Sequence, residues 1–285
     1  MYRVELLKNS ETVKYAEDSE RAEIEIRAEA GDIIRFSSDE ERFLCICIEP
    51  AAYEAVIYAQ DGCFDFEIPS GKRLCGFEQG VFDGELKAYI RKAEADYRDL
   101  ALNPYDIFTN EEVVPWDAPE WANPEHSPAV EGGKVKAFPH VFASRVTRDE
   151  GCFFARNAID GKAVGGGHGN YPYHSWGGGV HNDLSIAVYF GRKVRADKLL
   201  LNLRSDYSVD GEGFEHDTYW KRATLEFSDG SSITVSPEKT DADQIFEFEP
   251  RVTEWVLLKE LVPYVNPKGH NFAALNKIGI YGSEI

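Results

Sequence analysis

Hydrophobic and polar residues alternate along much of this chain, and the alternation predicts β-strands. In residues 23–30, isoleucine and alanine fall on one face of an extended segment and charged side chains fall on the other. Further runs that predict strands lie at residues 43–48, 54–59 and 63–68. Asp61-Gly62 predicts a hairpin turn between the last two runs. Several short strands separated by polar turns are typical of a small antiparallel β-sandwich.

One segment has a different period. From Asp83 to Leu100, apolar residues recur at the three- and four-residue spacing of a helix, and Asp83 can cap the first turn. Asn103-Pro104 would end this helix, because proline disfavours helical backbone in the residue before it. We therefore expect a small acidic β-sandwich domain over residues 1–103, with a single helix near residues 84–100.

A proline-rich stretch over residues 104–134 divides the chain. It has no clear period, and we interpret Trp116 and Trp121 as anchors that hold a linker on the surface, with ligand platforms as the alternative. Beyond the stretch, alternation returns and predicts a second domain over residues 135–285. This domain is mainly β, includes a hairpin turn at residues 228–230 and has no helix of note.

Charge and composition exclude several partners. The formal net charge is −19 at pH 7, so a nucleic acid or an anionic membrane would be repelled. No run approaches the roughly 18 apolar residues of a membrane span, and the N-terminus lacks the apolar core of a signal peptide. The five cysteines are an odd number and form no C-x-x-C motif. We expect a reduced, cytoplasmic protein, with export by a non-classical route as the alternative.

Six motifs occur in a fixed order in the second domain. They are N-A-I-D-G (157–161), S-W (175–176), S-I-A-V-Y-F-G-R (185–192), A-T-L-E-F-S-D-G (223–230), W-V-L-L (255–258) and F-A-A-L-N-K-I-G-I-Y-G (272–282). Together they resemble the galactose-binding-like jelly roll of discoidin (coagulation factor 5/8 type C) domains and of family 32 carbohydrate-binding modules, over about residues 135–285. The resemblance implies an eight-stranded sandwich that binds a ligand, typically a sugar, in loops at one end. The motifs are more specific for the fold than for the ligand, because this fold hosts many binding roles.

The resemblance also implies a structural calcium ion beside the loop after N-A-I-D-G. Asp160 occupies the position of a family ligand, but Lys277 stands where the family usually has a glutamate just before the last strand. Calcium prefers oxygen ligands. The ammonium of Lys277 therefore either takes the place of the cation, pairing with Asp160, or points away.

Candidate ligand-binding residues gather in and beside a glycine-rich loop between residues 158 and 220. Sugar recognition combines an aromatic face for the C–H face of a pyranose with planar polar groups for its hydroxyls. The candidates are His174, Trp176, His181, Arg204, Asp206, Tyr207, His216 and Tyr219. Arg204 and Asp206 are two residues apart at a strand end and so point the same way, which also fits a salt bridge that closes the sandwich. The matching tryptophan of the family often packs into the core below the loop, and this is the favoured interpretation of Trp176.

The predicted function is non-catalytic binding of a carbohydrate or glycan. A protein-interaction module is one alternative, and a metal-dependent or carboxylate-dependent carbohydrate-active enzyme is another. The histidines lack the tight H-x-H spacing of a strong metal site, and the chain has no G-x-S-x-G, phosphate-loop or H-E-x-x-H motif. The acidic first half could also pack against a second copy, so a homo-oligomer is a further expectation.

Overall fold

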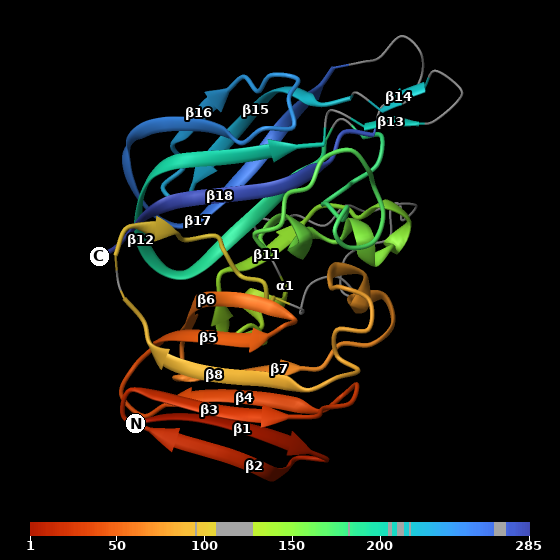
Figure 1. Cartoon of the computed structure of the whole chain (residues 1–285). Helices are drawn as coiled ribbons and strands as arrows, with labels where there is room; N and C mark the ends of the chain where they lie inside the picture. The colour runs from red at the N-terminus through yellow and green to blue at the C-terminus, as the bar shows by residue number, and fades with distance from the viewer. Residues whose placement is uncertain are drawn as a thin grey trace.

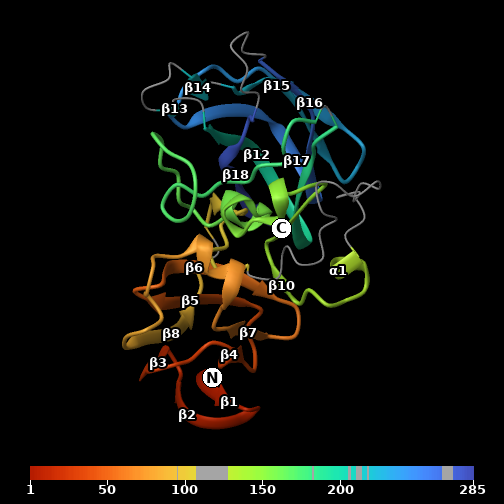
Figure 2. The same cartoon turned by 90° about the vertical axis from the view of Figure 1, so that its right-hand side faces the viewer.

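The computed structural model describes residues 1–94, 96–106, 128–181, 183–204, 207–209, 214–216, 218–264 and 272–285. These residues are built mainly of antiparallel β-strands, which confirms the predicted mainly β class. Figures 1 and 2 show two bodies of β-structure, with the N-terminal strands at one end of the molecule and the C-terminal strands at the other. No helix within the described ranges is long and apolar enough to cross a membrane.

The N-terminal half is a β-sandwich of two sheets. The first sheet has the order β2-β1-β4-β7, formed by Tyr2–Lys8 (β1), Glu11–Asp18 (β2), Ile33–Ser38 (β4) and Cys63–Glu67 (β7). The second has the order β10-β6-β5-β8-β3, formed by Arg21–Ile26 (β3), Phe43–Glu49 (β5), Ala52–Ala59 (β6), Leu86–Lys92 (β8) and Ala137–Phe138 (β10). Buried apolar side chains from both sheets make one core, as the alternating pattern predicts.

The helix predicted near residues 84–100 is wrong. This segment contains β8 and the short strand Arg98–Asp99 (β9). Leu86 and Ile90 are four residues apart, which fits a helix, but with Ala88 between them they also fit one face of a strand. Pairing decides the outcome, because β8 lies between β5 and β3 and forms hydrogen bonds on both sides.

The hairpin predicted at Asp61-Gly62 is also wrong. The segment is a turn, but β6 lies in the second sheet and β7 in the first, so the turn carries the chain from one sheet to the other. Gly62 has a φ of +70°, and a Cβ at this position would lie 2.7 Å from the carbonyl oxygen of Ser38. An Asp-Gly pair therefore indicates the turn without indicating which strands it joins.

The C-terminal half is a second antiparallel structure around its own core. Its main sheet has the order β16-β15-β17-β12-β18-β9, and β11 pairs with β12. The strands are His140–Ala143 (β11), Ile186–Leu203 (β12), Trp220–Phe227 (β15), Ser232–Val235 (β16), Gln244–Pro263 (β17) and Leu275–Glu284 (β18), with β13 (Tyr207–Val209) and β14 (Phe214–His216) as a separate pair. The predicted turn at residues 228–230 joins β15 and β16. β12 changes register between Tyr189 and Val194, and Figure 1 shows it curving around the core.

Helical structure in the described ranges is confined to short segments of six residues or fewer. Pro128–Glu131 (α1) is the α-helix, and 3-10 turns lie at Gly71–Gly76 (η1), Thr147–Asp149 (η3), Gly151–Phe153 (η4) and Ala155–Ala158 (η5). Three of these turns precede the glycine-rich loop. The C-terminal half therefore has no long helix in its described residues, in line with the sequence pattern.

Each half takes a short strand from beyond the predicted boundary. β9 pairs with β18 of the C-terminal sheet, and Leu100 packs into the C-terminal core. In return, β10 pairs with β6, and Tyr105 packs into the N-terminal core. The Tyr105 hydroxyl donates a hydrogen bond of 2.7 Å to the carbonyl oxygen of Tyr53. The domain boundaries at residues 103 and 135 stay a prediction, and the packing across them is continuous.

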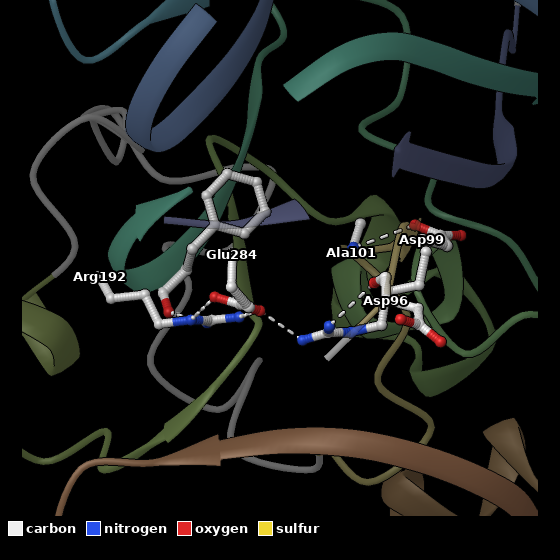
Figure 3. Close-up of polar contacts among 7 residues, drawn as sticks. Asp96, Asp99, Ala101, Arg192 and Glu284 are labelled. Atoms are coloured by element: carbon white, nitrogen blue, oxygen red, sulfur yellow. Dashed lines mark hydrogen bonds and ion pairs between the residues drawn. The ribbon is translucent and has the colours of Figure 1, made fainter. Parts of the chain in front are cut away.

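Charged groups are partly buried where the two halves meet. Figure 3 shows Glu284 of β18 beside the guanidinium group of Arg192. The guanidinium of Arg98 also donates to the Glu284 carboxylate. Arg192 Nε lies 2.7 Å from Glu284 Oε2, and its guanidinium lies 4.6 Å from the ring centre of Tyr58 in β6. This group therefore connects β12, β18 and β9 to the N-terminal sandwich.

Candidate functional site

A cavity of about 270 Å³ opens at one end of the C-terminal sheet. It is lined by Thr147, Arg148, Phe153, His168, Gly177, Gly179, Arg204, Phe272, Ala273 and Ala274. Leu203 and Leu275 are paired where β12 ends and β18 begins, so Arg204 and Ala274 come directly off the same sheet end. Loops that precede β12 complete the wall. We call this space the Arg204 cavity.

Arg204 is held in place by the chain that enters β18. Its backbone N–H donates to the carbonyl oxygen of Ala274 at 3.0 Å, and its guanidinium Nη2 donates to the carbonyl oxygen of Phe272 at 3.0 Å. The residue is only 3% exposed, although it lines the cavity. A guanidinium presents five donors in a rigid plane, which suits paired hydroxyl or carboxylate oxygens. The structure therefore places this predicted residue in a position from which it can contact a ligand.

The loop from Thr147 to Phe153 forms a second wall. Thr147 contacts the carbonyl oxygen of Gly177 through both its backbone N–H, at 2.7 Å, and its hydroxyl, at 2.8 Å. Arg148 has a positive φ of 51°, and its guanidinium pairs with Glu150 at 2.8 Å and lies 5.8 Å from the ring centre of Phe153. The Phe153 ring centre lies 6.2 Å from that of His168. An aromatic ring, a cation and an imidazole are thus adjacent.

His168 comes from the glycine-rich loop. Gly166 and Gly169 on either side have φ values of +82° and +137°, which side chains other than glycine rarely adopt. Partial burial, together with the charges of Arg204 and Arg148, lowers the pKa of His168 below its usual value. A neutral imidazole has one donor and one acceptor, so it can accept a hydrogen bond from a hydroxyl as well as donate one.

Phe272 supplies an aromatic face at the cavity. It is 38% exposed, so part of its ring is open to a ligand. The backbone carbonyl oxygen of Phe272 accepts the hydrogen bond from Arg204. The residue that carries the aromatic ring therefore also holds the guanidinium. Polar groups beside an accessible ring are the combination that sugar recognition requires.

His174 does not line the Arg204 cavity. It is 2% exposed, its Nε2 is hydrogen-bonded to Asp160 Oδ2, and its ring stacks on Tyr171 with 5.4 Å between centres. The other Asp160 oxygen, Oδ1, accepts a hydrogen bond of 2.8 Å from the backbone N–H of Lys162. Loop position and polar neighbours predicted ligand contact, but the imidazole is buried in a pair that fixes the loop.

The surroundings of Asp160 do not fit the calcium site that the sequence resemblance implies. Both carboxylate oxygens of Asp160 already accept hydrogen bonds, one from a backbone N–H and the other from the imidazole of His174. Calcium prefers oxygen ligands, and an imidazole at this position does not supply one. Lys277 acts on a different acid: burial raises the pKa of Asp99, and the charge of Lys277 opposes that rise. Within the described ranges, no group of three or more histidine, cysteine or acidic residues could hold a metal ion.

Trp176 is a core residue. Its side chain is fully buried, its indole N–H donates to the carbonyl oxygen of Arg145 at 3.0 Å, and its ring centre lies 5.6 Å from that of Trp220. The position leaves no face for a ligand. Core packing, the alternative for Trp176 that the sequence left open, is the arrangement observed.

The remaining predicted residues lie around the cavity or beyond it. His181 is partly buried beside Arg145, which together with burial lowers its pKa, and it does not line the cavity. Tyr219 stacks on Tyr264, with 5.5 Å between ring centres, and packs against the core. Tyr207 and His216 are paired in the backbone of β13 and β14, and their side chains lie outside the described part of the structure, as does all of Asp206.

The three cavity residues with ring side chains, Phe153, His168 and Phe272, were not among the predicted ligand contacts. His168 was visible among the glycines, but nothing in its neighbours distinguished it from a mobile loop residue. Phe272 opens the motif that leads into the last strand, and Phe153 precedes the loop, so each looked like part of the framework. The contact between Phe272 and Arg204 becomes visible only when β12 and β18 lie side by side in the folded chain.

No family model matches the chain, and no curated protein matches it. Solved structures that are similar to it include carbohydrate-binding modules. Chitosan-binding module 1 from a chitosanase/glucanase of Paenibacillus sp. IK-5 is 17% identical, with a TM-score of 0.37, and the match covers 50% of this chain and 95% of that one. The family 32 module of C. perfringens NanJ, solved in complex with galactose, is 15% identical, with a TM-score of 0.34 and coverage of 50% and 91%. A fucose-binding module of Streptococcus pneumoniae is 12% identical, with a TM-score of 0.35 and coverage of 51% and 95%.

Proposed function

We propose that this chain binds a carbohydrate without transforming it, and that the Arg204 cavity holds the sugar. The observation that carries the proposal is the placement of a buried guanidinium, an imidazole and a half-open phenyl ring around one space of about 270 Å³. This volume lies just below the roughly 300–1,000 Å³ that is typical of small-molecule sites, which favours a ligand the size of one sugar unit.

The chemistry of each group matches one feature of a sugar. The guanidinium of Arg204 can donate paired hydrogen bonds to neighbouring ring oxygens or hydroxyls. The neutral imidazole of His168 can accept from one hydroxyl or donate to another. The Phe272 ring can pack against the apolar C–H face of a pyranose. Because Arg204 is already fixed by backbone contacts, ordering its side chain on binding costs little entropy.

Calorimetric titration of the full chain with a panel of monosaccharides tests this proposal. The panel includes galactose, N-acetylgalactosamine, fucose and glucosamine. For any sugar that binds, we expect Phe272→Ala to weaken the affinity about tenfold, since it removes the exposed ring from the cavity. We expect Arg204→Lys to weaken it at least as much, because an ammonium cannot donate in a fork.

Tyr15→Ala is the matched control. Tyr15 is 57% exposed on β2, at the opposite end of the molecule in Figure 1, so its loss should leave the affinity unchanged. Equal binding by the parent chain and both cavity variants would place the sugar elsewhere. No heat of binding with any sugar would overturn carbohydrate binding itself and move attention to a protein partner. Release of product from the corresponding nitrophenyl glycosides would replace simple binding with catalysis.

A further inference from the structure

A second aromatic side chain lies beside the wall of the Arg204 cavity. Tyr173 is 41% exposed, and its ring lies against the backbone of Gly167. A Cβ at position 167 would come within 2.8 Å of the Tyr173 ring, so the contact requires glycine. The next residue, His168, lines the cavity. The chain therefore holds the Tyr173 ring one residue away from the proposed sugar site.

The loop that carries Tyr173 is fixed at three points. The Tyr173 N–H donates to the carbonyl oxygen of Asn170 at 3.0 Å, and the Tyr173 carbonyl oxygen accepts from the N–H of Gly169 at 3.2 Å. Between these bonds, the N–H of Tyr171 donates to the carbonyl oxygen of Cys75 at 2.8 Å, which ties the loop to η1 of the N-terminal half. Isolated exposed aromatic residues are common on protein surfaces. The Tyr173 ring differs from such residues, because its backbone is held by hydrogen bonds and one side of the ring packs on Gly167. It can therefore contact a ligand with little loss of conformational entropy.

We infer that the Arg204 cavity binds the end of an oligosaccharide, and that Tyr173 contacts the second sugar unit. The inference rests on the proposed function of the cavity. A space of about 270 Å³ accommodates a single unit, so the next unit must leave along the rim. Tyr173 presents an accessible ring against Gly167, the residue before His168, where the C–H face of the second unit can pack on it.

The test compares the affinities for short and longer sugars, rather than asking only whether a sugar binds. The affinities of the full chain for glucosamine, chitobiose and chitotriose, and for galactose and lactose, are measured by calorimetry. The parent chain should bind the longer member of a recognised series more tightly than its monosaccharide. Tyr173→Ala should leave the monosaccharide affinity unchanged and weaken binding of the longer sugar roughly three- to tenfold. Tyr173→Phe, which keeps the ring, should retain the full gain.

Tyr97→Ala provides a control with a similarly exposed ring. Tyr97 is 50% exposed and packs on Tyr281, with 6.4 Å between ring centres, so its removal should not alter the dependence on chain length. The inference is overturned if the parent chain binds short and long sugars equally, or if Tyr173→Ala weakens both by the same factor. Either result would leave the cavity proposal standing, whereas a parent chain that binds none of these five sugars and neither fucose nor N-acetylgalactosamine would overturn both.

Discussion

The Arg204 cavity and the junction between the two halves both contain a buried arginine, but the two residues have different surroundings. At the junction, Arg156 is 1% exposed and uses all three of its guanidinium nitrogens within the protein. They contact the carbonyl oxygens of Asp106 and Pro104 and the side-chain oxygen of Asn157, at 3.1, 2.9 and 3.4 Å. Its guanidinium also lies 4.7 Å from the ring centre of Phe77. The space that it borders is only about 50 Å³.

Arg204 is almost as buried, at 3% exposure, yet it borders a space about five times larger, 270 Å³ against 50 Å³. The exposed ring of Phe272 borders that space, whereas the Phe77 ring that contacts Arg156 is buried. The comparison shows that burial of a charged side chain does not by itself mark a binding site. What distinguishes the two regions is whether the hydrogen-bonding groups face a space large enough for a ligand.

Replacement of Arg156 should have the largest effect on stability. Arg156→Met keeps much of the volume but removes the donors, so the carbonyl oxygens of Pro104 and Asp106 lose a buried partner. We expect the free energy of unfolding to fall by about 3–5 kcal/mol. Urea denaturation followed by fluorescence measures the change.

Arg148→Met is the control for this substitution. The Arg148 side chain is 54% exposed and pairs with an exposed glutamate, so its loss should cost less than about 1 kcal/mol of stability. Equal losses in the two variants would show that the junction arginine contributes no more to stability than a surface residue.

The sequence pattern predicts the framework better than it predicts the partners of each strand. β3 was recognisable because Ile24, Ile26 and Ala28 alternate with charged residues, although the strand covers Arg21–Ile26 rather than residues 23–30. β8 was not, because spacing by four residues satisfies a helix and a strand equally, and only its two neighbours in the sheet decide between them. The exchange of β9 and β10 between the halves has no local signal, since each strand is two residues long.

The candidate site shows the same limit at the level of side chains. Arg204 could be predicted because an arginine at a strand end, next to loops, lies at the edge of a sandwich. The depth of a loop residue could not be predicted. His174 is buried because Asp160, fourteen residues earlier, accepts its hydrogen bond. Phe272 lies beside Arg204 through a strand pairing between segments about seventy residues apart, which only the folded chain reveals.

Asp99 tests how a buried carboxylate at the junction affects the stability of the fold at different pH values. Figure 3 shows its carboxylate beside Ala101, and it accepts hydrogen bonds of 3.0 Å from the N–H groups of Ala101 and Ile280. Burial raises the pKa of Asp99 to about 6, against 3.8 for a free aspartate, even though Lys277 acts in the opposite direction. Well below pH 3.8 the acid is protonated in both the folded and unfolded chains. As the pH rises from 4 to 6, the unfolded chain releases its proton first, so this group progressively destabilises the fold.

Asp99→Asn should remove that dependence. An asparagine oxygen can accept the same two hydrogen bonds without carrying a charge. The stability of the variant relative to the parent should therefore rise by about 2 kcal/mol between pH 4 and pH 7, measured by urea denaturation at each pH. Asp229→Asn is a control of opposite sign, because hydrogen bonds from Ser231 lower the pKa of that exposed carboxyl. A stability difference for Asp99→Asn that does not change with pH would contradict the assignment.

The smallest of these effects is expected at Glu284, where the two halves share one carboxylate. Burial alone would raise the pKa of Glu284, but the hydrogen bonds and charges of Arg192 and Arg98 hold it below its usual value. Its stabilising contribution is therefore present above the unfolded pKa of 4.5 and lost as the pH falls through the lower folded value. Glu284→Gln should lower the free energy of unfolding by about 1–2 kcal/mol at pH 7 and make the acid limb of the stability curve shallower.

Glu247→Gln is the control. The Glu247 carboxylate is 78% exposed and lies 3.8 Å from Lys198, so its loss should change stability by less than about 0.5 kcal/mol. If the two variants lose the same stability at pH 7, the carboxylate between the arginines holds the halves together no more strongly than an exposed ion pair does.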